Sequence, residues 1–479
     1  MTFKDKIFNK KVNEQQIEEK FDVVIIGGGQ TGLILARQLI KKEIKTLVID
    51  KDKLGIKTSL DLKNFTKLIK RIKSKNQDPR IMINTFPQRL EYISKEQNQE
   101  LINPLISNSF FKFIKGNIEN IDEYELTIND KKYGFRKLVF ATGSYFVEPT
   151  NYPNLKKEMY FNLNEISRIK EYYENIAIYG TNIEALELAY AFALLGSNVY
   201  IFDENVNPFN NFDDDLESIL KTDFMTDKII WCLESKIINH IKSSDKAIRI
   251  IYSTQGKEKY IEVDKIFVTG NKVSETRNLK TKYDLKLNSN NSIIIDSNFR
   301  VKNNPTYYAI GDVNGIRFIP DFANLQAVSL SRIITGQKVS KFNLYNVGFS
   351  IDIEPQICFY GMNKQDLDYH DIKFNEFIYD FNYELNSKLF AHKSKLKVYT
   401  NEKHEILGVF LYGHKVKELL SIFILAANNK IKFHKLAYLS FLFYSKSEFI
   451  RDAAIDYELE FVGLSKKIKK ITNTKEGRK

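Results

Sequence analysis

The stretch from Phe21 to Asp50 constrains the fold more than any other part of this 479-residue chain. An apolar run, Val23 to Ile26, is typical of a buried parallel strand, and it ends in the loop Gly27-Gly28-Gly29-Gln30-Thr31-Gly32. Apolar residues at helical spacing follow from Leu33 to Leu39, and a second strand is expected from Thr46 to Asp50. The pattern predicts a βαβ unit and therefore an α/β fold.

The glycines of this loop each have a physical task. Gly27 permits a tight turn, Gly29 lets the backbone approach a pyrophosphate, and Gly32 allows the helix to pack closely on the strand. The helix N-terminus offers free N–H groups and a partial positive charge to phosphates. Asp50 ends the second strand, at the spacing from Gly32 where an acid would bind the ribose hydroxyls. A glycine-rich turn without a ligand is the alternative, but the combination favours dinucleotide binding, with Gln30 and Thr31 in the same loop.

The middle of the chain repeats this pattern. A strand ending in Gly180 is followed by a helix, Thr181 to Gly196, and a strand, Asn198 to Phe202. Asp203 then stands where Asp50 stood in the first copy. Two such units in one chain are a stronger signal than either copy alone.

Two further strand ends carry motifs. One apolar strand ends in Ala-Thr142-Gly143-Ser, and another ends in Ala-Ile-Gly311-Asp312-Val. From Leu344 the pattern changes to hairpin-like strands and then to helices, expected over Lys415–Asn428 and Lys435–Phe443, which indicates a separate α+β unit.

The order of these motifs resembles the class I pyridine nucleotide-disulfide oxidoreductases, the family of dihydrolipoamide dehydrogenase and of glutathione and mercuric reductases. The resemblance covers residues 21 to 462. It implies an α/β fold with two Rossmann-like FAD/NAD(P)-binding domains and a C-terminal α+β dimerisation domain. The expected division is an N-terminal extension (1–20), a first FAD-binding part (21–150), an NAD(P)-binding-like domain (151–285), a second FAD-binding part (286–343), a dimerisation domain (344–465) and a basic tail (466–479).

The resemblance also implies roles for individual residues. Gly27, Gly29 and Gly32 match the FAD pyrophosphate loop, and Asp50 matches the acid on the adenosine ribose. Thr142 and Gly143 match the motif that closes the FAD domain. Gly311 and Asp312 match the Gly-Asp pair whose carboxylate bonds the ribityl part of FAD, the alternative for Asp312 being a helix cap. The same resemblance implies a homodimer.

The redox cysteines of the family are missing. The family places a CxxxxC pair shortly after the Leu-Gly that corresponds to Leu54-Gly55, whereas this chain continues IKTSLDLK and has only Cys232 and Cys358, far apart. A disulfide relay requires two thiols that exchange electrons with the flavin and then with substrate. We therefore expect no disulfide reduction by the family mechanism.

The acid–base histidine of the family is missing too. Aligned on Glu448, its position is Phe443, which transfers no proton, and His434 lies too far upstream. The catalytic residues are therefore left unknown. The six histidines show no paired metal spacing, and no metal site is expected.

Binding of NAD(P)H is left open. The glycine that would admit the second pyrophosphate is Asn182, and Glu184 puts negative charge beside it. In favour of NAD(P)H binding, Gly180 and Asp203 are retained, and Glu187 matches the family glutamate that pairs with a lysine beside the flavin. Lys63 is a hypothetical replacement for that lysine. The downstream Gly-Arg-x-Pro-Asn signature is altered, to Gly270-Asn271-Lys272-Val273-Ser274.

Composition narrows the partners. The net charge of +12 comes mostly from lysines scattered along the chain, without a basic stripe and interleaved aromatics, so nucleic acid is not expected. No apolar run reaches the roughly 18 residues of a membrane span, and the N-terminus lacks a signal-peptide core, so a cytoplasmic protein is expected.

Three hypotheses of function remain. The first is a flavoprotein oxidoreductase that passes electrons from NAD(P)H through FAD directly to a small-molecule acceptor. The second is a catalytically inactive, FAD-bound dimer that serves as an interaction or regulatory module. The third is a chain that binds no cofactor and keeps the glycines only for its fold.

Overall fold

The computed structural model describes residues 17–463 except 57, 210, 211, 214, 223, 225, 226, 245, 271, 278, 280–284, 339–342, 382–393 and 444. The predicted basic tail, most of the N-terminal extension and Asn271 lie outside the described residues. The chain forms two compact units. The first contains Met1–Tyr173, Asn239–Ile248 and Lys265–Phe342, and the second contains Glu174–Ile238, Arg249–Asp264 and Asn343–Lys479.

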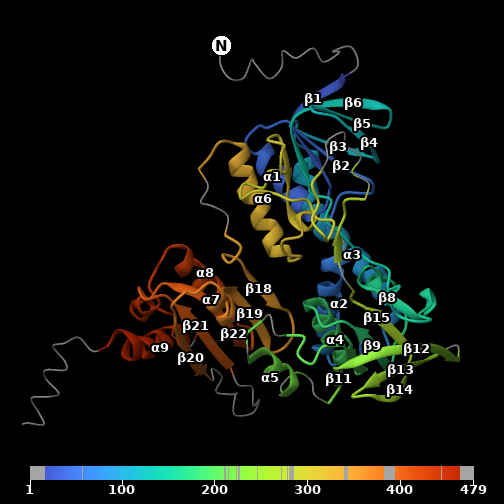
Figure 1. Ribbon diagram of the computed structural model, residues 1–479, viewed down its shortest axis with the longest axis vertical. Helices are drawn as coiled ribbons and strands as arrows, with labels where there is room; N and C mark the ends of the chain where they lie inside the picture. The colour runs from blue at the N-terminus through green and yellow to red at the C-terminus, as the bar shows by residue number, and fades with distance from the viewer. Residues whose placement is uncertain are drawn as a thin grey trace, which may run out of the picture. The chain divides into compact units, whose positions relative to one another are not determined.

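The first unit is built around the predicted βαβ element (Figure 1). Strand β1 (Ile17–Ile26) pairs in parallel with β2 (Thr46–Asp50), and α1 (Gln30–Ile40) connects them. The sheet order is β3-β2-β1-β6-β5-β4, with β17 also on β6. Its other members are β3 (Phe111–Lys115), β4 (Ile118–Ile121), β5 (Glu125–Ile128), β6 (Lys131–Phe140) and β17 (Tyr307–Ala309).

Strand β6 has different partners along its length. Its first half pairs antiparallel with β5, and its last three residues pair in parallel with β17. Because β17 comes much later in the chain than β6, a distant segment completes the parallel part of the sheet. The parallel strands β1, β2, β3, β6 and β17 therefore end at one edge.

Buried apolar side chains cover both faces of this sheet. On one face, α1 and α6 (Pro320–Ile334) lie side by side and pack on Val23 and Ile25 (Figure 1). On the other face, Val24 and Ile26 pack against β4, β5 and Ile293. The unit also contains α2 (Thr58–Lys73), η2 (Ile83–Thr85), α3 (Phe86–Ile106), β7 (Ser144–Phe146), η3 (Lys157–Met159), β8 (Tyr160–Asn162), η4 (Leu163–Arg168), β15 (Lys265–Val268), β16 (Lys272–Ser274) and η5 (Gly311–Asn314).

The second unit opens with the second predicted βαβ element. Strands β9 (Asn175–Tyr179) and β10 (Asn198–Phe202) pair in parallel and are joined by α4 (Ile183–Leu195), which is buried along most of its length. Then follow α5 (Asp215–Thr222), β11 (Ile229–Cys232) and β14 (Lys257–Val263), while β12 (Ser235–Ser244) and β13 (Ala247–Thr254) contain residues of both units.

The C-terminal part of the second unit is an antiparallel sheet with helices on it, as predicted. The strand order is β18-β19-β22-β21-β20, and the core beneath α8 and α9 contains Phe423, Phe449 and Tyr457. The elements are β18 (Gly348–Ile351), β19 (Gln356–Gly361), α7 (Lys364–Tyr369), β20 (Asn375–Phe381), β21 (Ser394–Thr400), β22 (Ile406–Gly413), η6 (Lys417–Leu419), α8 (Leu420–Asn428), η7 (Phe433–Tyr438), α9 (Glu448–Tyr457) and η8 (Glu458–Val462).

A buried ion pair joins two parts of the second unit. Lys397 of β21 donates to Asp213, which precedes α5, at 2.6 Å, and both side chains are almost fully buried. Tyr399 donates to the other oxygen of Asp213 at 3.0 Å, and Asp215 lies 3.1 Å from Lys397. The segment after β10 is thereby fixed to the C-terminal sheet.

Candidate functional site

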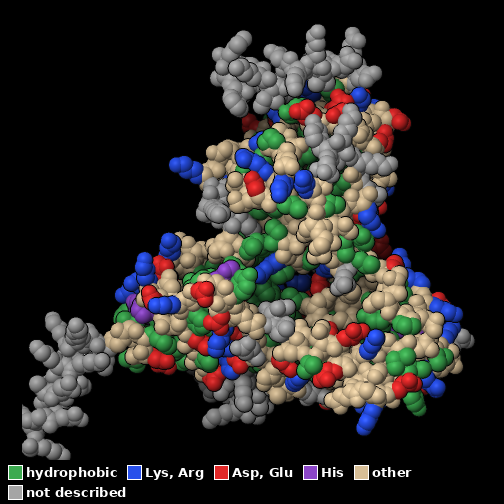
Figure 2. Space-filling view, in the orientation of Figure 1, with side chains coloured by type: hydrophobic (Ala, Val, Ile, Leu, Met, Phe, Trp, Pro, Cys, Tyr) green, Lys and Arg blue, Asp and Glu red, His purple; other side chains and the backbone are tan. Residues whose placement is uncertain are grey.

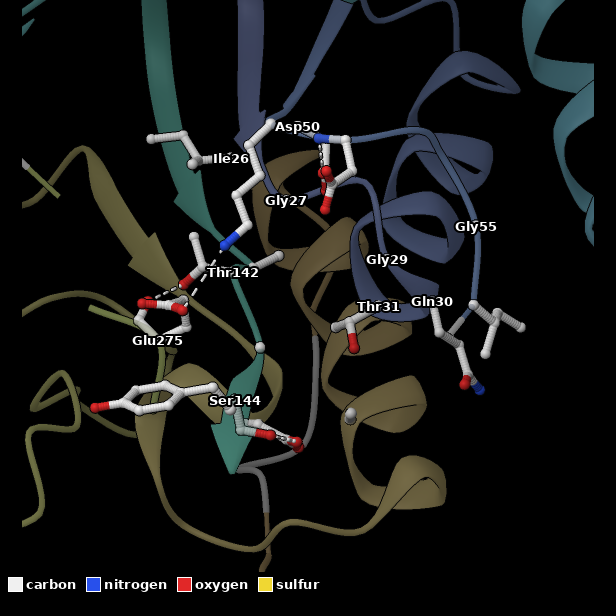
Figure 3. Close-up of a pocket in the computed structure, with 18 of the residues that line it drawn as sticks. Ile26, Gly27, Gly29, Gln30, Thr31, Asp50, Gly55, Thr142, Ser144 and Glu275 are labelled. Atoms are coloured by element: carbon white, nitrogen blue, oxygen red, sulfur yellow. Dashed lines mark hydrogen bonds and ion pairs between the residues drawn. The ribbon is translucent and has the colours of Figure 1, made fainter. Parts of the chain in front are cut away.

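A cavity of about 590 Å³ lies in the first unit, at the carboxyl ends of its parallel strands. Ligands of open α/β sheets bind at this edge. Residues from the segments 26–31, 49–61, 116–118, 141–146, 272–279 and 310–323 line it. Figure 3 shows Thr142, Ser144 and Glu275 on one side of the cavity and Gly29 and Gln30 on the other.

The glycines of this loop differ in what lies beside each of them. Gly27 has φ +115°, and a Cβ there would lie 2.2 Å from the Ala141 carbonyl oxygen, so only glycine fits. A Cβ on Gly32 would lie 2.0 Å from the carbonyl oxygen of Gly27. By contrast, a Cβ on Gly29 would meet no atom within 4 Å, because Gly29 faces the cavity. The fold requires Gly27 and Gly32, whereas open space beside Gly29 is available to a ligand.

The N-terminus of α1 supplies the attractive groups. Gly29 caps the helix, no acidic residue stands in the first turn, and Gln30 and Thr31 line the cavity. Gln30 Nε2 donates to Asn324 Oδ1 of α6 at 2.9 Å, which fixes the two helices together. Backbone N–H groups at such a helix start bind phosphate.

Asp50 is oriented by backbone N–H groups. Its Oδ2 accepts from Gly28 N at 2.7 Å, and its Oδ1 accepts from Asp52 N at 2.9 Å. The carboxylate oxygens keep lone pairs for further donors, and the residue lines the cavity. Hydroxyl donors such as those of a ribose match these lone pairs.

Thr142 and Gly143 connect the end of β6 to a segment much later in the chain. Thr142 Oγ1 donates to the Glu275 carbonyl at 2.6 Å, and Glu275 N donates to the Gly143 carbonyl at 2.9 Å. The short strands β7 and β16 continue this contact as an antiparallel pair. These bonds close one side of the cavity.

Asp312 is held beside the same strands. Ser144 Oγ donates to Asp312 Oδ2 at 2.6 Å, and Ser274 Oγ donates to the Asp312 carbonyl at 2.6 Å. Gly311, at φ +77°, donates its N–H to the buried Gln326 Oε1 at 2.7 Å. Asp312 lies inside η5, whose N-cap is Ile310, and it lines the cavity. The alternative role of a helix N-cap therefore does not apply to Asp312.

The structure gathers most of the residues that the sequence singled out on the FAD side. Those that line the cavity are Gly27, Gly29, Gln30, Thr31, Asp50, Thr142, Gly143 and Asp312. Gly32 and Gly311 do not line it; Gly32 abuts Gly27, and Gly311 abuts Thr31.

A charged group on the cavity wall was not predicted. Glu275 pairs with Arg277 at 2.5 Å and lies 3.9 Å from Lys51 Nζ. The Arg277 guanidinium holds the pKa of the Glu275 carboxyl below its usual value and stacks over Tyr145. No motif marks these residues. Ser144, which follows the Ala-Thr-Gly motif directly, could have been found from its position.

The residues of the nicotinamide side lie in the second unit. Asn182 Oδ1 accepts from Ala185 N at 2.9 Å and so caps α4, and Thr181 Oγ1 donates to Asp203 Oδ2 at 2.6 Å. Gly180 has φ +109° and continues the turn after β9. Glu187 is buried and accepts from Asp352 N at 2.9 Å. The asparagine that replaces a glycine is a helix cap in this structure.

Neither cysteine belongs to the cavity lining. Cys232 ends β11 and is partly buried, whereas Cys358 is fully buried in β19. Burial raises the pKa of the Cys232 thiol to about 11 and that of Cys358 to about 12, which disfavours the reactive thiolates. Among the described residues, no group of three His, Cys, Asp or Glu side chains is placed to hold a metal ion.

No helix within the described part of the chain is long and apolar enough to cross a membrane. Figure 2 shows Lys and Arg side chains spread over the visible face and interspersed with Asp and Glu.

The fold and the cavity define a class of protein. Residues 21–329 match the family described as pyridine nucleotide-disulphide oxidoreductase, which is more than half of the chain, so the protein belongs to that family of flavoprotein oxidoreductases. Members of the family depend on FAD and take NAD(P)H as substrate. The predicted fold class is confirmed.

Individual relatives are distant. The dihydrolipoyl dehydrogenase of Mycoplasma genitalium is 24% identical over 365 residues, which cover 72% of this chain and 78% of the relative. A soluble pyridine nucleotide transhydrogenase of Vibrio vulnificus is 21% identical, with coverage of 84% and 90%. The structure of the HOCl-induced flavoprotein disulfide reductase RclA from Escherichia coli has a TM-score of 0.78 and 17% identity, with coverage of 90% and 99%, and shows the likeness of fold alone.

Proposed function

We propose that this protein binds FAD in the cavity of the first unit and passes electrons from NAD(P)H through it directly to a small-molecule acceptor. The observation that carries the proposal is a cavity lined by most of the predicted FAD-side residues and by no thiol among the described residues. Bound flavin itself supplies the hydride and electron chemistry. The chain has to bind it, orient it and leave it accessible.

Named groups fit the parts of FAD. The open space at Gly29 and the start of α1 fit the pyrophosphate. The oriented Asp50 carboxylate fits a ribose, and Asp312, oriented by Ser144, fits a polyol hydroxyl. Thr142 and Gly143 keep the cavity wall closed through Glu275.

A dithiol relay is not supported. The segment after Gly55 enters α2 at Thr58 without a cysteine, and the thiols of Cys232 and Cys358 belong to other elements. Electrons that reach the flavin then go to the acceptor without a thiol intermediate. An oxidised nicotinamide is one acceptor to include in assays, since a relative is named a pyridine nucleotide transhydrogenase.

The nicotinamide site would use the second unit. Gly180, Asp203 and Glu187 are the residues assigned to it, with the turn after β9 next to the nucleotide. Lys63, in α2, stays a prediction from the sequence alone. Asn182 is the residue that argues against this site.

An inactive, FAD-bound homodimer is the alternative function. Members of the family are typically homodimeric, and the C-terminal stretch exposes large apolar side chains, including Leu442 and Phe443 at 81% and 86%. The phenylalanine at the family histidine position and the asparagine in the second loop favour this alternative over an enzyme. The cytoplasmic location stays a prediction.

An anaerobic titration of the purified, FAD-loaded protein with NADH and then NADPH distinguishes the oxidoreductase from the inactive dimer. Bleaching of the flavin band with either nicotinamide supports the enzyme. A band that persists with both, yet bleaches on photoreduction, supports the inactive dimer. A protein purified without flavin that also fails to bind added FAD contradicts both.

A further inference from the structure

One cavity acid has no part in the roles assigned so far. Asp61 lies in the first turn of α2 and lines the cavity. Its Oδ1 accepts a hydrogen bond from Ser94 Oγ of α3 at 2.8 Å. The neighbouring helix therefore fixes the direction of this carboxyl group.

The same face of α3 also fixes the loop that leads to Asp61. Asn98 Oδ1 accepts from Ile56 N at 2.7 Å, and Asn98 Nδ2 donates to the Ile56 carbonyl at 3.2 Å. Gln97 Oε1 accepts from Asn64 Nδ2 at 2.8 Å. Positions 94, 97 and 98 lie on one face of a helix. Asp61 is thus presented by a rigid support, which a group that transfers protons requires.

The surroundings favour the protonated form of Asp61. Burial raises the pKa of its carboxyl above the usual range, and the Ser94 hydrogen bond and the charge of Lys53 oppose this only in part. Asp50, the last residue of β2, and Asp52, in the loop after it, line the same cavity. Glu275 differs, because Arg277 lowers its pKa. A carboxyl that keeps its proton closer to neutral pH is suited to act as an acid.

We propose that Asp61 donates the proton that a quinone-type acceptor takes up when it receives a hydride from FAD in this cavity, an inference that rests on the function proposed above. The hydride forms an O–H bond at one quinone oxygen, its electron pair makes the ring aromatic and leaves the second oxygen as an oxyanion, and this oxyanion takes the Asp61 proton. Water then reprotonates the carboxylate. The net reaction consumes NAD(P)H, a proton and quinone, and yields NAD(P)⁺ and hydroquinone.

The test compares Asp61→Asn with wild type in the reoxidation of photoreduced flavin, so that no nicotinamide is needed. Menadione, which needs a proton, is compared with ferricyanide, which accepts an electron alone. We expect D61N to slow reoxidation by menadione roughly 10²-fold, typical of a lost general acid, and to leave ferricyanide unchanged. The wild-type rate with menadione falls as pH rises through the Asp61 pKa, and D61N lacks this dependence.

A positioning control and a readout without turnover complete the test. Ser94→Ala removes a hydrogen bond that lowers the Asp61 pKa, so the pH at which the menadione rate falls shifts upward. In infrared spectra, the protonated-carboxyl band of the wild type titrates with the same midpoint and is missing in D61N. Equal menadione rates in wild type and D61N, or equal losses with both acceptors, would overturn the assignment. Failure of NAD(P)H alone to bleach the flavin refutes the donor half of the proposed function and leaves the comparison of acceptors valid.

Discussion

At the scale of single residues, the glycines of the first loop have different purposes although they form one motif. Gly27 and Gly32 have backbone atoms where a Cβ would stand, so they serve the fold. Gly29 adjoins open cavity instead. Sequence alone gives all three the same status, because the distinction depends on what folds against each of them.

Matched substitutions test this difference. We expect Gly32→Ala to be destabilised by about 1–3 kcal/mol or more, because its methyl group meets the Gly27 carbonyl. Gly29→Ala should keep the stability of the apoprotein, because its methyl group meets no protein atom. The methyl group would enter the space proposed for the pyrophosphate, so we expect FAD affinity to fall at least about tenfold, which corresponds to about 1.4 kcal/mol. Urea denaturation of the apoproteins and FAD titration measure the two effects. Equal FAD affinity in G29A and wild type would argue against the pyrophosphate position.

Asn182 offers a second test at this scale. As the cap of α4 it is replaceable by glycine at a cost of a few tenths of a kcal/mol, whereas alanine costs about 1 kcal/mol. If its side chain obstructs a pyrophosphate, Asn182→Gly binds NADPH or NADH more tightly than wild type, and Asn182→Ala gains less because it keeps a Cβ. Flavin bleaching at varied nicotinamide concentration measures this. Unchanged affinity in N182G would mean that Asn182 is no obstacle.

At the scale of elements, the sequence predicted those with a strong local pattern. The two βαβ units and the C-terminal α+β region are present because each combines apolar runs with glycine or cap signals. The prediction of a helix over Lys435–Phe443 was wrong. The structure has the short η7 (Phe433–Tyr438) there, and Leu439, Leu442 and Phe443, which stand at helical spacing, are exposed. Apolar spacing does not show whether a residue faces the core or the solvent.

The residues of the site were predicted only where a local sequence motif marks them. Gly27 and Asp50 belong to local motifs, and both line the cavity. The Glu275 group and the support of Asp61 by Ser94 depend on contacts between distant segments, and no local pattern encodes them.

The buried pair of Lys397 and Asp213 gives an element-level prediction. Lys397→Met leaves the Asp213 carboxylate buried without its cationic partner, although the Tyr399 hydroxyl and the Asp215 N–H still donate to it, and we expect a loss of about 3–5 kcal/mol in the free energy of unfolding. Lys395→Met, in the same strand, removes a more exposed partner of Asp215 and should cost about 0–1 kcal/mol. Urea denaturation of the two variants and the wild type measures these losses in the free energy of unfolding. Equal losses would contradict a special role of the buried pair.

The histidines of the C-terminal region predict a pH dependence. Burial lowers the pKa of His404 and His434 from the usual 6.5, and the buried His434 Nδ1 has no hydrogen-bond partner among the described residues. The unfolded chain therefore binds more protons than the folded protein at pH values just below about 6.5, and stability falls as the pH drops through this range. The melting temperature should decline less steeply on acidification in His434→Gln. NMR titration of both imidazoles checks the direction, and pKa values above about 6.5 would refute it.

At the scale of the whole molecule, exposed apolar side chains in the C-terminal stretch predict self-association. Leu442 and Phe443 are adjacent large apolar residues whose surfaces are mostly exposed to solvent. Exposed apolar surface of this kind often marks an interface, and members of the family are typically homodimers. We expect light scattering to give twice the mass of one chain for the wild type. The double substitution Leu442→Ser, Phe443→Ser should shift this mass toward one chain at micromolar concentration. A wild-type monomer at all concentrations would contradict the prediction.

The position of β17 in the sheet has a consequence for the order of biosynthesis. The cavity takes its glycine loop from the start of the chain, but the strand beside β6, Asp312 and the Gln326 amide that binds Gly311 are all translated much later. A nascent chain on the ribosome thus lacks the strand beside the end of β6 until Ala309 has left the exit tunnel, and the later half of the cavity until Gln326 has left it. With FAD bound in this cavity, as proposed, flavin capture is a late event that follows synthesis of most of the polypeptide, and the early part of the chain must remain soluble without it.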